Sequence, residues 1–260
     1  MKNPEFKRNL WLAFSLHRLI AMPAILTLLF LAVILSNTFQ PAKDLHSAAT
    51  TLFIFIVWMW GMRNANASIT DELRDNTWDQ QRMSALQPWD MTWGKLFGST
   101  AFNWYGGLIC LLVAAFTGFA YDEPDTLMNL LTLAATAVLL HATTIALNLH
   151  ASRIESRIIQ RGGIGWLALF ILFTVVSSSH HMWSSYLITW WGMQIPHNLF
   201  LFFSSSLFAA CAVFAAWRTM CNALQVHTLP WVWPLFAVVL GIYLEASPAI
   251  TQAAQVTCCL

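Results

Sequence analysis

Charged and aromatic side chains that could form ion pairs or a docking surface are concentrated in residues 69–98. The candidate residues in this stretch are Glu72, Arg74, Thr77, Trp78, Asp79, Arg82, Leu86, Pro88, Trp89, Gly94 and Lys95. From Trp78 onward, apolar residues recur close to helical spacing, which predicts a short amphipathic helix. Residues 75–77 can cap this helix, and Pro88 ends it because the residue before a proline is pushed out of the α region. Tryptophans in an otherwise charged stretch favour a docking surface over a solvated loop, since aromatic residues anchor interfaces.

Eight histidines raise the question of a haem or metal site. A haem held by two imidazoles needs histidines from different helices at similar depth. His141 lies well inside an apolar segment and His150 lies at its end, and nine residues at about 100° each place them on opposite faces. His180 and His181 have no carboxylate or thiol nearby in the sequence, which favours polar interface residues over metal ligands.

The sequence lacks the motifs of several enzyme classes. It contains no GxxxxGK[ST] phosphate loop, HExxH, GxSxG or CxxC, so ATP hydrolysis by a phosphate loop, membrane hydrolysis and dithiol redox chemistry have no motif behind them. Secondary transporters and channels usually place ionisable groups at mid-membrane. Here only His141 and, near a segment end, Glu245 qualify. We therefore expect a non-catalytic chain that carries no cofactor.

Composition indicates a membrane protein. The 260 residues are 58% hydrophobic and only 10% charged, with a mean hydropathy of +0.59, whereas soluble chains are about 25% charged. A bilayer core of about 30 Å needs roughly 20 apolar residues. The segments that approach this length are 19–36, 47–62, 99–121, 126–149, 164–179, 198–217 and 229–244. The sequence predicts one all-α transmembrane domain over 1–260 with six to seven membrane-spanning helices, and its net charge of +1 gives no reason to expect nucleic acid.

The gaps between these segments alternate in charge. Of the 13 Lys and Arg residues, only Lys43 falls in the second set of gaps, beside Asp122, Glu123 and Asp125. The positive-inside rule makes the other side cytoplasmic. We expect a multi-pass protein of a plasma membrane, such as a bacterial inner membrane, with a cytoplasmic N-terminus (1–18) and a cytoplasmic loop at 63–98. The uncharged segment 180–197 is expected to be a short helix or re-entrant element in the outer interface.

The candidate stretch resembles the coupling segment of type-2 ABC exporter permeases. In that family a Glu, a Gly-Thr-containing stretch, an L-x-x-P and a G-K follow one another between the second and third spans. Here the matching residues are Glu72, Thr77-Trp78-Asp79, residues 84–89 and Gly94-Lys95, with Asn76 where the family often has Gly. The family commonly has six spans and a cytoplasmic C-terminus, so segment 229–244 would be a further span or an interfacial helix.

The resemblance implies a transmembrane subunit that forms a translocation pathway and couples to separate ATPase subunits, which would hold ATP and Mg. A second permease copy or a related permease would complete the pathway, and membrane lipids would surround both. Glu72 and Lys95 would brace the coupling element, while Trp78 and Trp89 would fill a groove on the ATPase. Arg153, Glu155 and Arg157 form a second candidate contact. The alternatives are a haem-carrying or other membrane anchor of a redox complex, and a secondary transporter or channel.

Overall fold

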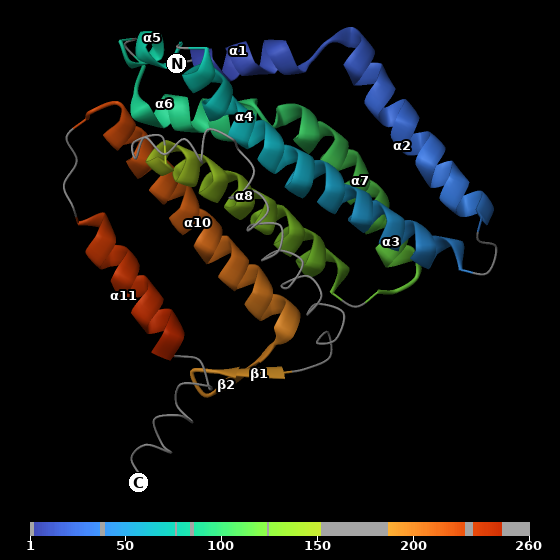
Figure 1. Cartoon of the computed structure of the whole chain (residues 1–260). Helices are drawn as coiled ribbons and strands as arrows, with labels where there is room; N and C mark the ends of the chain where they lie inside the picture. The colour runs from blue at the N-terminus through green and yellow to red at the C-terminus, as the bar shows by residue number, and fades with distance from the viewer. Residues whose placement is uncertain are drawn as a thin grey trace.

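The computed structural model describes residues 3–36, 40–75, 77–83, 86–123, 125–151, 187–226 and 231–245. These residues are mostly helical (Figure 1). The helices are α1 (Pro4–Ala13), α2 (Leu16–Ser36), α3 (Pro41–Phe53), η1 (Ile54–Trp60), α4 (Gly61–Arg74), α5 (Trp78–Arg82), α6 (Pro88–Trp93), η2 (Gly94–Gly98), α7 (Ala101–Ala120), α8 (Thr126–Ala151), α10 (His197–Ala223) and α11 (Val232–Glu245). The strands are β1 (Leu187–Trp190) and β2 (Met193–Pro196).

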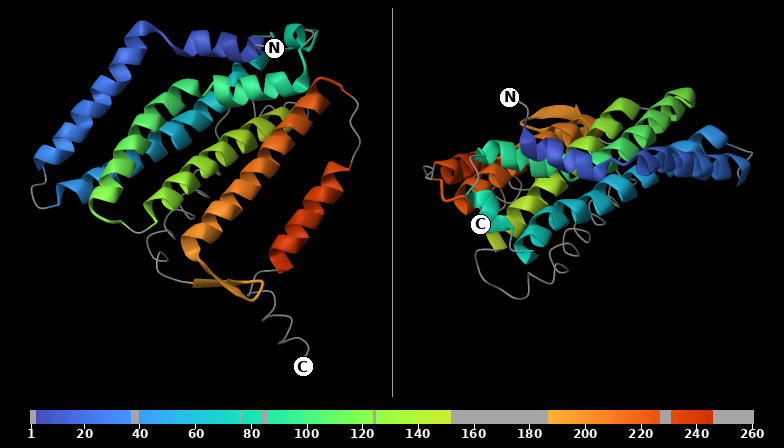
Figure 2. Two further views of the ribbon diagram at one scale, coloured as in Figure 1. Left: turned by 180° about the vertical axis from the view of Figure 1, so that it is seen from behind. Right: turned by 90° about the horizontal axis from the view of Figure 1, so that it is seen from above.

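Within the described residues, five helices are long and apolar enough to cross a membrane. They are Leu16–Ser36, Pro41–Arg74, Ala101–Ala120, Thr126–Ala151 and His197–Ala223. The chain is therefore a mostly helical, multi-pass membrane protein, as its composition predicts. Figures 1 and 2 show α2 and α11 at opposite edges of the row of helices.

The second span differs from its prediction. The helix runs without a break from Pro41 through η1 to Arg74, so it extends beyond the predicted span 47–62 at both ends, and residues 63–74 of the predicted loop continue the same helix. Hydropathy falls after Met62, but the polar residues that follow remain helical. The predicted span 164–179 lies outside the described residues. Helix α11 has 14 residues, about 21 Å, which is shorter than a bilayer core of about 30 Å.

The middle of this long helix is π-helical, and its freed carbonyls are bonded by side chains from neighbouring helices. Asn103 Nδ2 donates to the Ile56 carbonyl at 2.8 Å, and His141 Nε2 lies 2.8 Å from the Val57 carbonyl. A Cβ on Gly61 would stand 2.3 Å from His141 Nε2, so glycine makes room for the imidazole. His141, weighed above as a haem ligand, thus has its Nε2 engaged with the backbone.

Small residues allow the spans to approach one another closely. On α10, Ala209, Ala212 and Ala216 are buried, and this helix packs along α8. On α7, a Cβ at Gly107 would lie 2.3 Å from Val57 Cγ2, so α7 can approach η1 only because this position has no side chain. Close contact through small residues is the usual way in which membrane helices associate.

The two ends of the bundle carry different elements (Figure 1). Helices α1, α5 and α6 gather at one end with the C-terminal ends of α4 and α10. At the other end β1 pairs antiparallel with β2, from Leu187↔Pro196 to Trp190↔Met193. Trp191 and Gly192 both have positive φ, as a two-residue I′ turn requires. The expectation of a short helix in segment 180–197 is therefore wrong for residues 187–196, where paired β-branched and aromatic residues favour strands.

Candidate functional site

Three residues, Asn3, Pro4 and Glu5, favour the start of the N-terminal helix α1. The Asn3 side chain accepts a hydrogen bond from the Phe6 N–H at 3.1 Å, and Pro4 occupies the first turn together with Glu5. Asn as N-cap, Pro at the first helical position and an acidic first turn are all favourable there. Residues 1–18 are expected from the sequence only to form a cytoplasmic terminus, although this capping signal also predicts a helix there.

Helix α1 lies against α6 and η2, and the contact depends on Gly94. Asn3 Nδ2 donates to the Asp90 carbonyl at 2.7 Å, and Asn9 Nδ2 donates to the Gly94 carbonyl at 3.1 Å. A Cβ on Gly94 would lie 2.7 Å from Glu5 Cγ and 3.0 Å from the Phe6 backbone N. The absence of a side chain at Gly94 therefore allows η2 and the N-terminal helix to pack closely.

Lys95 is the centre of the site, because its side chain is fully buried. Its Nζ pairs with Glu72 Oε2, lies 3.8 Å from Glu5 Oε1 and donates to the Ser68 carbonyl at 3.2 Å. The ammonium also stands 5.6 Å from the centre of the Trp78 ring, within cation–π range. Burial lowers the pKa of Lys95, and the adjacent Glu72 and Glu5 carboxylates oppose this shift.

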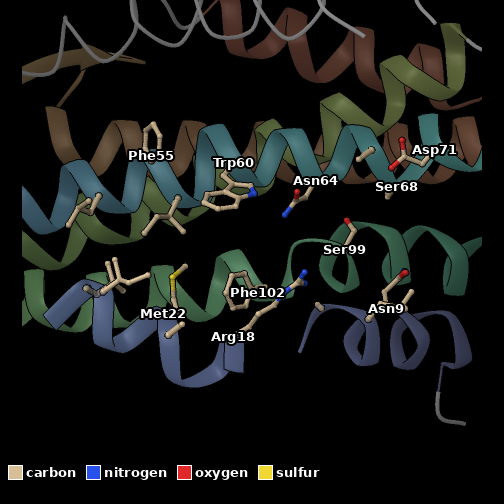
Figure 3. A pocket seen from close by; sticks show the side chains of 18 of the residues that line it. Asn9, Arg18, Met22, Phe55, Trp60, Asn64, Ser68, Asp71, Ser99 and Phe102 are labelled. Atoms are coloured by element: carbon tan, nitrogen blue, oxygen red, sulfur yellow. The ribbon is translucent and has the colours of Figure 1, made fainter. Parts of the chain in front are cut away.

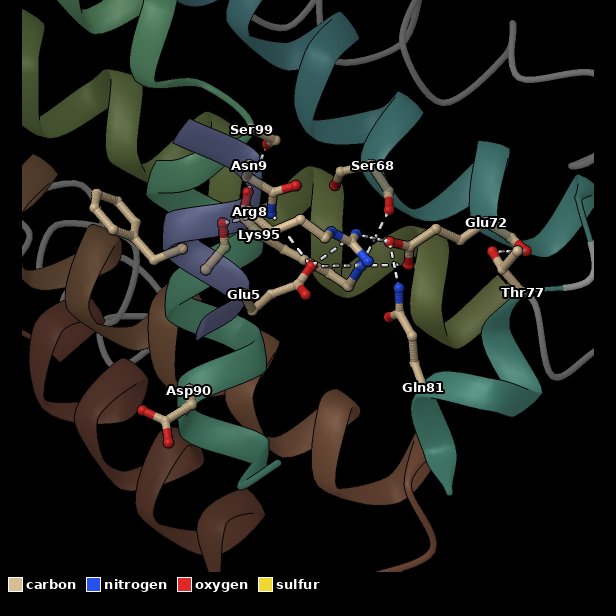
Figure 4. A network of polar contacts seen from close by, with 12 residues as sticks. Glu5, Arg8, Asn9, Ser68, Glu72, Thr77, Gln81, Asp90, Lys95 and Ser99 are labelled. Atoms are coloured by element: carbon tan, nitrogen blue, oxygen red, sulfur yellow. Dashed lines mark hydrogen bonds and ion pairs between the residues drawn. The ribbon is translucent and has the colours of Figure 1, made fainter. Parts of the chain in front are cut away.

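Glu72 joins the remaining members of this ionic cluster, which we define as Glu5, Arg8, Glu72, Gln81 and Lys95 (Figure 4). Its Oε1 accepts hydrogen bonds from Arg8 Nη2 at 2.8 Å and from Gln81 Nε2 at 2.7 Å. Arg8 also pairs with Glu5 at 3.1 Å. The cluster therefore ties together α1, α4, α5 and η2, and its two carboxylates balance its two cations.

The other predicted residues near this cluster lie at the end of α4 or in the segment between α4 and α6. Thr77 donates to the Glu72 carbonyl through its backbone N–H at 3.0 Å and its hydroxyl at 3.3 Å, so it closes the end of α4. Leu86 is partly buried against the core beneath Trp78, and Arg74 is exposed at the end of α4. The side chains of Asp79 and Arg82, and the residues Arg153, Glu155 and Arg157, lie outside the described part of the structure.

Two expectations for this segment need correction. Trp78 is only 9% exposed and belongs to a buried apolar cluster, so its ring packs inside this chain and does not face a partner's groove. The amphipathic helix expected to run from Trp78 to Pro88 ends at Arg82, and Pro88 instead begins α6. Gln87 is extended, with ψ of 146°, and a proline fits the first turn because its missing N–H is not needed there.

Trp89 remains accessible at the same end of the bundle, because 43% of its surface is exposed. Its ring lies 6.0 Å from that of Trp93 and 6.4 Å from that of Trp217, and Trp93 lies 4.5 Å from Phe97. Helix α6 therefore carries a half-exposed aromatic surface that is anchored on α10. We call Trp89, Trp93 and Trp217 the tryptophan shelf.

The site consists of ion pairs and hydrogen bonds that join separate elements of the chain. Among the described residues, no group of three or more His, Cys, Asp or Glu side chains is placed to hold a metal ion. A cluster of opposite charges can hold separate elements in one arrangement, and a half-exposed aromatic surface on α6 can contact another protein.

Comparisons with known proteins give no identification: no family model, curated protein or solved structure matches this chain. The fold and the site define it as a multi-pass helical membrane protein in which an ionic cluster centred on the buried Lys95 joins α1, α5 and η2 to α4.

Proposed function

We propose that this chain is the transmembrane subunit of an ATP-binding-cassette exporter. It would form part of a translocation pathway together with a second permease and would receive mechanical work from ATPase subunits that hold ATP and Mg. The observation that carries this proposal is the ionic cluster, which links α5 and η2 to the helix that continues into the second span. The orientation proposed from the basic residues places this end of the molecule in the cytoplasm.

The cluster supports a coupling role because it joins the two spans on either side of the segment. The helix from Pro41 to Arg74 has 34 residues, roughly 51 Å at 1.5 Å each, and Glu72 lies near its end. Lys95 precedes α7 by six residues. Breaking a buried ion pair costs about 3–5 kcal/mol. A displacement of α5 or α6 would therefore move the two spans together before it broke the ion pair between Glu72 and Lys95.

The tryptophan shelf supports a docking role. Trp89 and Trp93 are each 43% exposed, and Met83 is 82% exposed beside α5. Large aromatic side chains supply much of the binding energy at protein interfaces. An ATPase groove that accepts the shelf would press directly on α6, which is continuous with η2.

The test separates docking from coupling. The tagged chain is purified from its native membranes, and co-purifying proteins are identified by mass spectrometry and assayed for ATP hydrolysis. Trp89→Ala should weaken association with a phosphate-loop ATPase by about ten-fold or more. Trp233→Ala is the matched control, because Trp233 is 70% exposed on α11 and should not affect association.

Glu72→Ala should give a different result. Glu72 is turned into the ionic cluster, with only 13% of its side chain exposed, so the ATPase should still bind while transport no longer follows ATP turnover. Both variants should insert into the membrane at normal levels. A wild-type chain that reaches full activity with no ATPase present, or a Trp89→Ala chain that binds its ATPase normally, would contradict the proposal.

A further inference from the structure

A cavity of about 910 Å³ lies between α2 and the long helix formed by α3, η1 and α4 (Figure 3). Residues of α1 and α7 complete it at the end where the ionic cluster lies. This volume is at the upper end of the range of about 300–1,000 Å³ for small-molecule sites. It lies between two helices that are long and apolar enough to cross a membrane, so we take its occupant to come from the membrane.

The cavity is kept open by the elbow between α1 and α2. The ionic cluster fixes α1, and at the elbow the Phe14 ring lies 6.2 Å from that of Phe102 and 6.0 Å from that of Tyr105. Tyr105 also donates to the Leu19 carbonyl at 3.2 Å. Within α2 itself only Leu26 and Phe30 are buried. Helix α2 is therefore held at its beginning and leaves space beside the long helix.

The walls of the cavity are apolar along most of the span. Met22, Ile25 and Leu29 line it from α2, while Phe55 and Ile56 line it from η1. An empty space of this size would leave these side chains without the dispersion contacts that close packing supplies. An extended hydrocarbon chain running along α2 would restore them.

The other end of the cavity is polar, and three charged residues, Arg18, Asp71 and Glu72, line it. Arg18 lines it from α2 and Asp71 from α4, together with Ser68 and Ser99. Figure 3 shows Arg18 and Asp71 coming from opposite walls. Both residues are exposed, and in the described part of the chain no ion pair involves either of these two side chains. Glu72, which also lines the cavity, is by contrast bonded to Lys95, Arg8 and Gln81.

We propose that this cavity binds one phospholipid with a primary ammonium headgroup, taken from the leaflet at the α1 end. The Arg18 guanidinium pairs with its phosphate, since guanidinium groups bind phosphate oxygens through two parallel hydrogen bonds. The Asp71 carboxylate accepts hydrogen bonds from its ammonium, and one acyl chain lies along α2 and η1. A helix from a protein partner would leave the charged end unpaired, and an anionic lipid would place its net charge beside Asp71 and Glu72. This inference does not depend on an ATPase partner.

Trp60 allows a direct test, because it lines the cavity and is 46% exposed. The full-length protein is placed in nanodiscs whose lipids carry brominated acyl chains, which quench tryptophan fluorescence on contact. Three headgroups are compared on the same chains: phosphoethanolamine, phosphocholine and phosphoglycerol. The difference between wild-type and Trp60→Phe protein isolates the Trp60 signal. Trp233→Phe is the matched control, because Trp233 is 70% exposed on the apolar helix α11 and does not line the cavity.

The expected result is quenching of Trp60 that saturates at a low fraction of the phosphoethanolamine lipid and is weaker with the other two. Arg18→Gln and Asp71→Asn should each weaken it about ten-fold or more, because each removes at least one charge-assisted hydrogen bond to the headgroup. The Trp233 signal should not depend on the headgroup in any variant, and an unchanged Trp233 signal also confirms that the variant is folded.

Three outcomes would overturn the inference. Quenching of Trp60 that matches Trp233 in every lipid would mean that only bulk lipid reaches it. Preference for phosphoglycerol, lost in Arg18→Gln and kept in Asp71→Asn, would mean an anionic lipid. Absence of quenching with all three headgroups would mean that a protein segment fills the cavity. None of these results would change the expected association with an ATPase, so the two proposals fail separately.

Discussion

Lys95 shows how one residue depends on several others. A lysine with no exposed surface is stable only when its charge is paired, because burying an ion costs several kcal/mol even after the protein relaxes. Here Glu72 and Glu5 supply the opposite charge, and Arg8 balances the second carboxylate. The four charges therefore act as a unit, and the stability that each contributes depends on the presence of the others.

This dependence predicts the result of a double-mutant cycle. Lys95→Met leaves two carboxylates with one cation and should lower the free energy of unfolding by about 3–5 kcal/mol, and Glu72→Gln should be similar because it leaves the buried Lys95 underpaired. The double variant should lose less than the sum, by about 1–3 kcal/mol. Thermal or denaturant unfolding in detergent measures each value. Lys43→Met, at an exposed position on α3, should stay within about 0.5 kcal/mol of wild type. Strict additivity would mean that the charges do not interact.

At the scale of helices, hydropathy alone is sufficient to find the long apolar elements. The predictions for 19–36, 99–121, 126–149 and 198–217 each fall on a helix that is long enough to span a membrane. Hydropathy cannot find α1, because this short helix is amphipathic and crosses nothing. It also cannot find η1, since π-helical turns are set by tertiary contacts such as those of Asn103 and His141 with the freed carbonyls.

The candidate site is harder to predict than the spans. Its residue types can be read from 69–98, and Glu72 and Lys95 are among them, but their partners Glu5 and Arg8 lie about 65 residues or more away along the chain. Pro88 gives the same local signal whether a helix ends before it or begins at it, because in both cases the preceding residue is extended. The burial of the Trp78 ring could be predicted only once the position of Lys95 is known.

The contact between α1 and Gly94 gives a prediction about a whole helix. Gly94→Leu would bring a side chain within 3.0 Å of the α1 backbone at Phe6, which cannot move independently of its helix. We expect a loss of about 1–3 kcal/mol in unfolding free energy, the usual cost of overpacking. Hydrogen exchange over residues 4–13 should also become faster, because α1 is displaced.

Gly241 provides the matched control for this substitution. It also lies in a helix, α11, but a Cβ there would meet nothing within 4 Å. Gly241→Ala should therefore be neutral or stabilise the protein by up to about 1 kcal/mol, since alanine is the better helix former. Equal effects of the two substitutions, or unchanged hydrogen exchange in α1 of the Gly94→Leu variant, would show that α1 does not pack on Gly94.

For the whole molecule, the property that bears on function is the difference in basic residues between its two ends. Lys7, Arg8, Arg74 and Lys95 lie on the elements at the α1 end, whereas Lys43 lies near the start of α3, at the end that carries the β1–β2 hairpin (Figure 1). A basic excess on one side of a membrane protein faces the cytoplasm. The ionic cluster and the tryptophan shelf would then lie on the side where a nucleotide-hydrolysing partner can reach them.

Cysteine accessibility tests this orientation directly. Met83 is exposed beside α5 and Lys43 is exposed near the start of α3, so Met83→Cys and Lys43→Cys report the two ends of the same bundle. A membrane-impermeant maleimide applied to intact cells should label Lys43→Cys, and should label Met83→Cys only after the cells are permeabilised. Wild-type protein gives the background from native thiols, of which Cys110 and Cys221 are buried. The reverse pattern would place the tryptophan shelf outside the cell, away from ATP, and the proposed coupling to an ATPase could not operate.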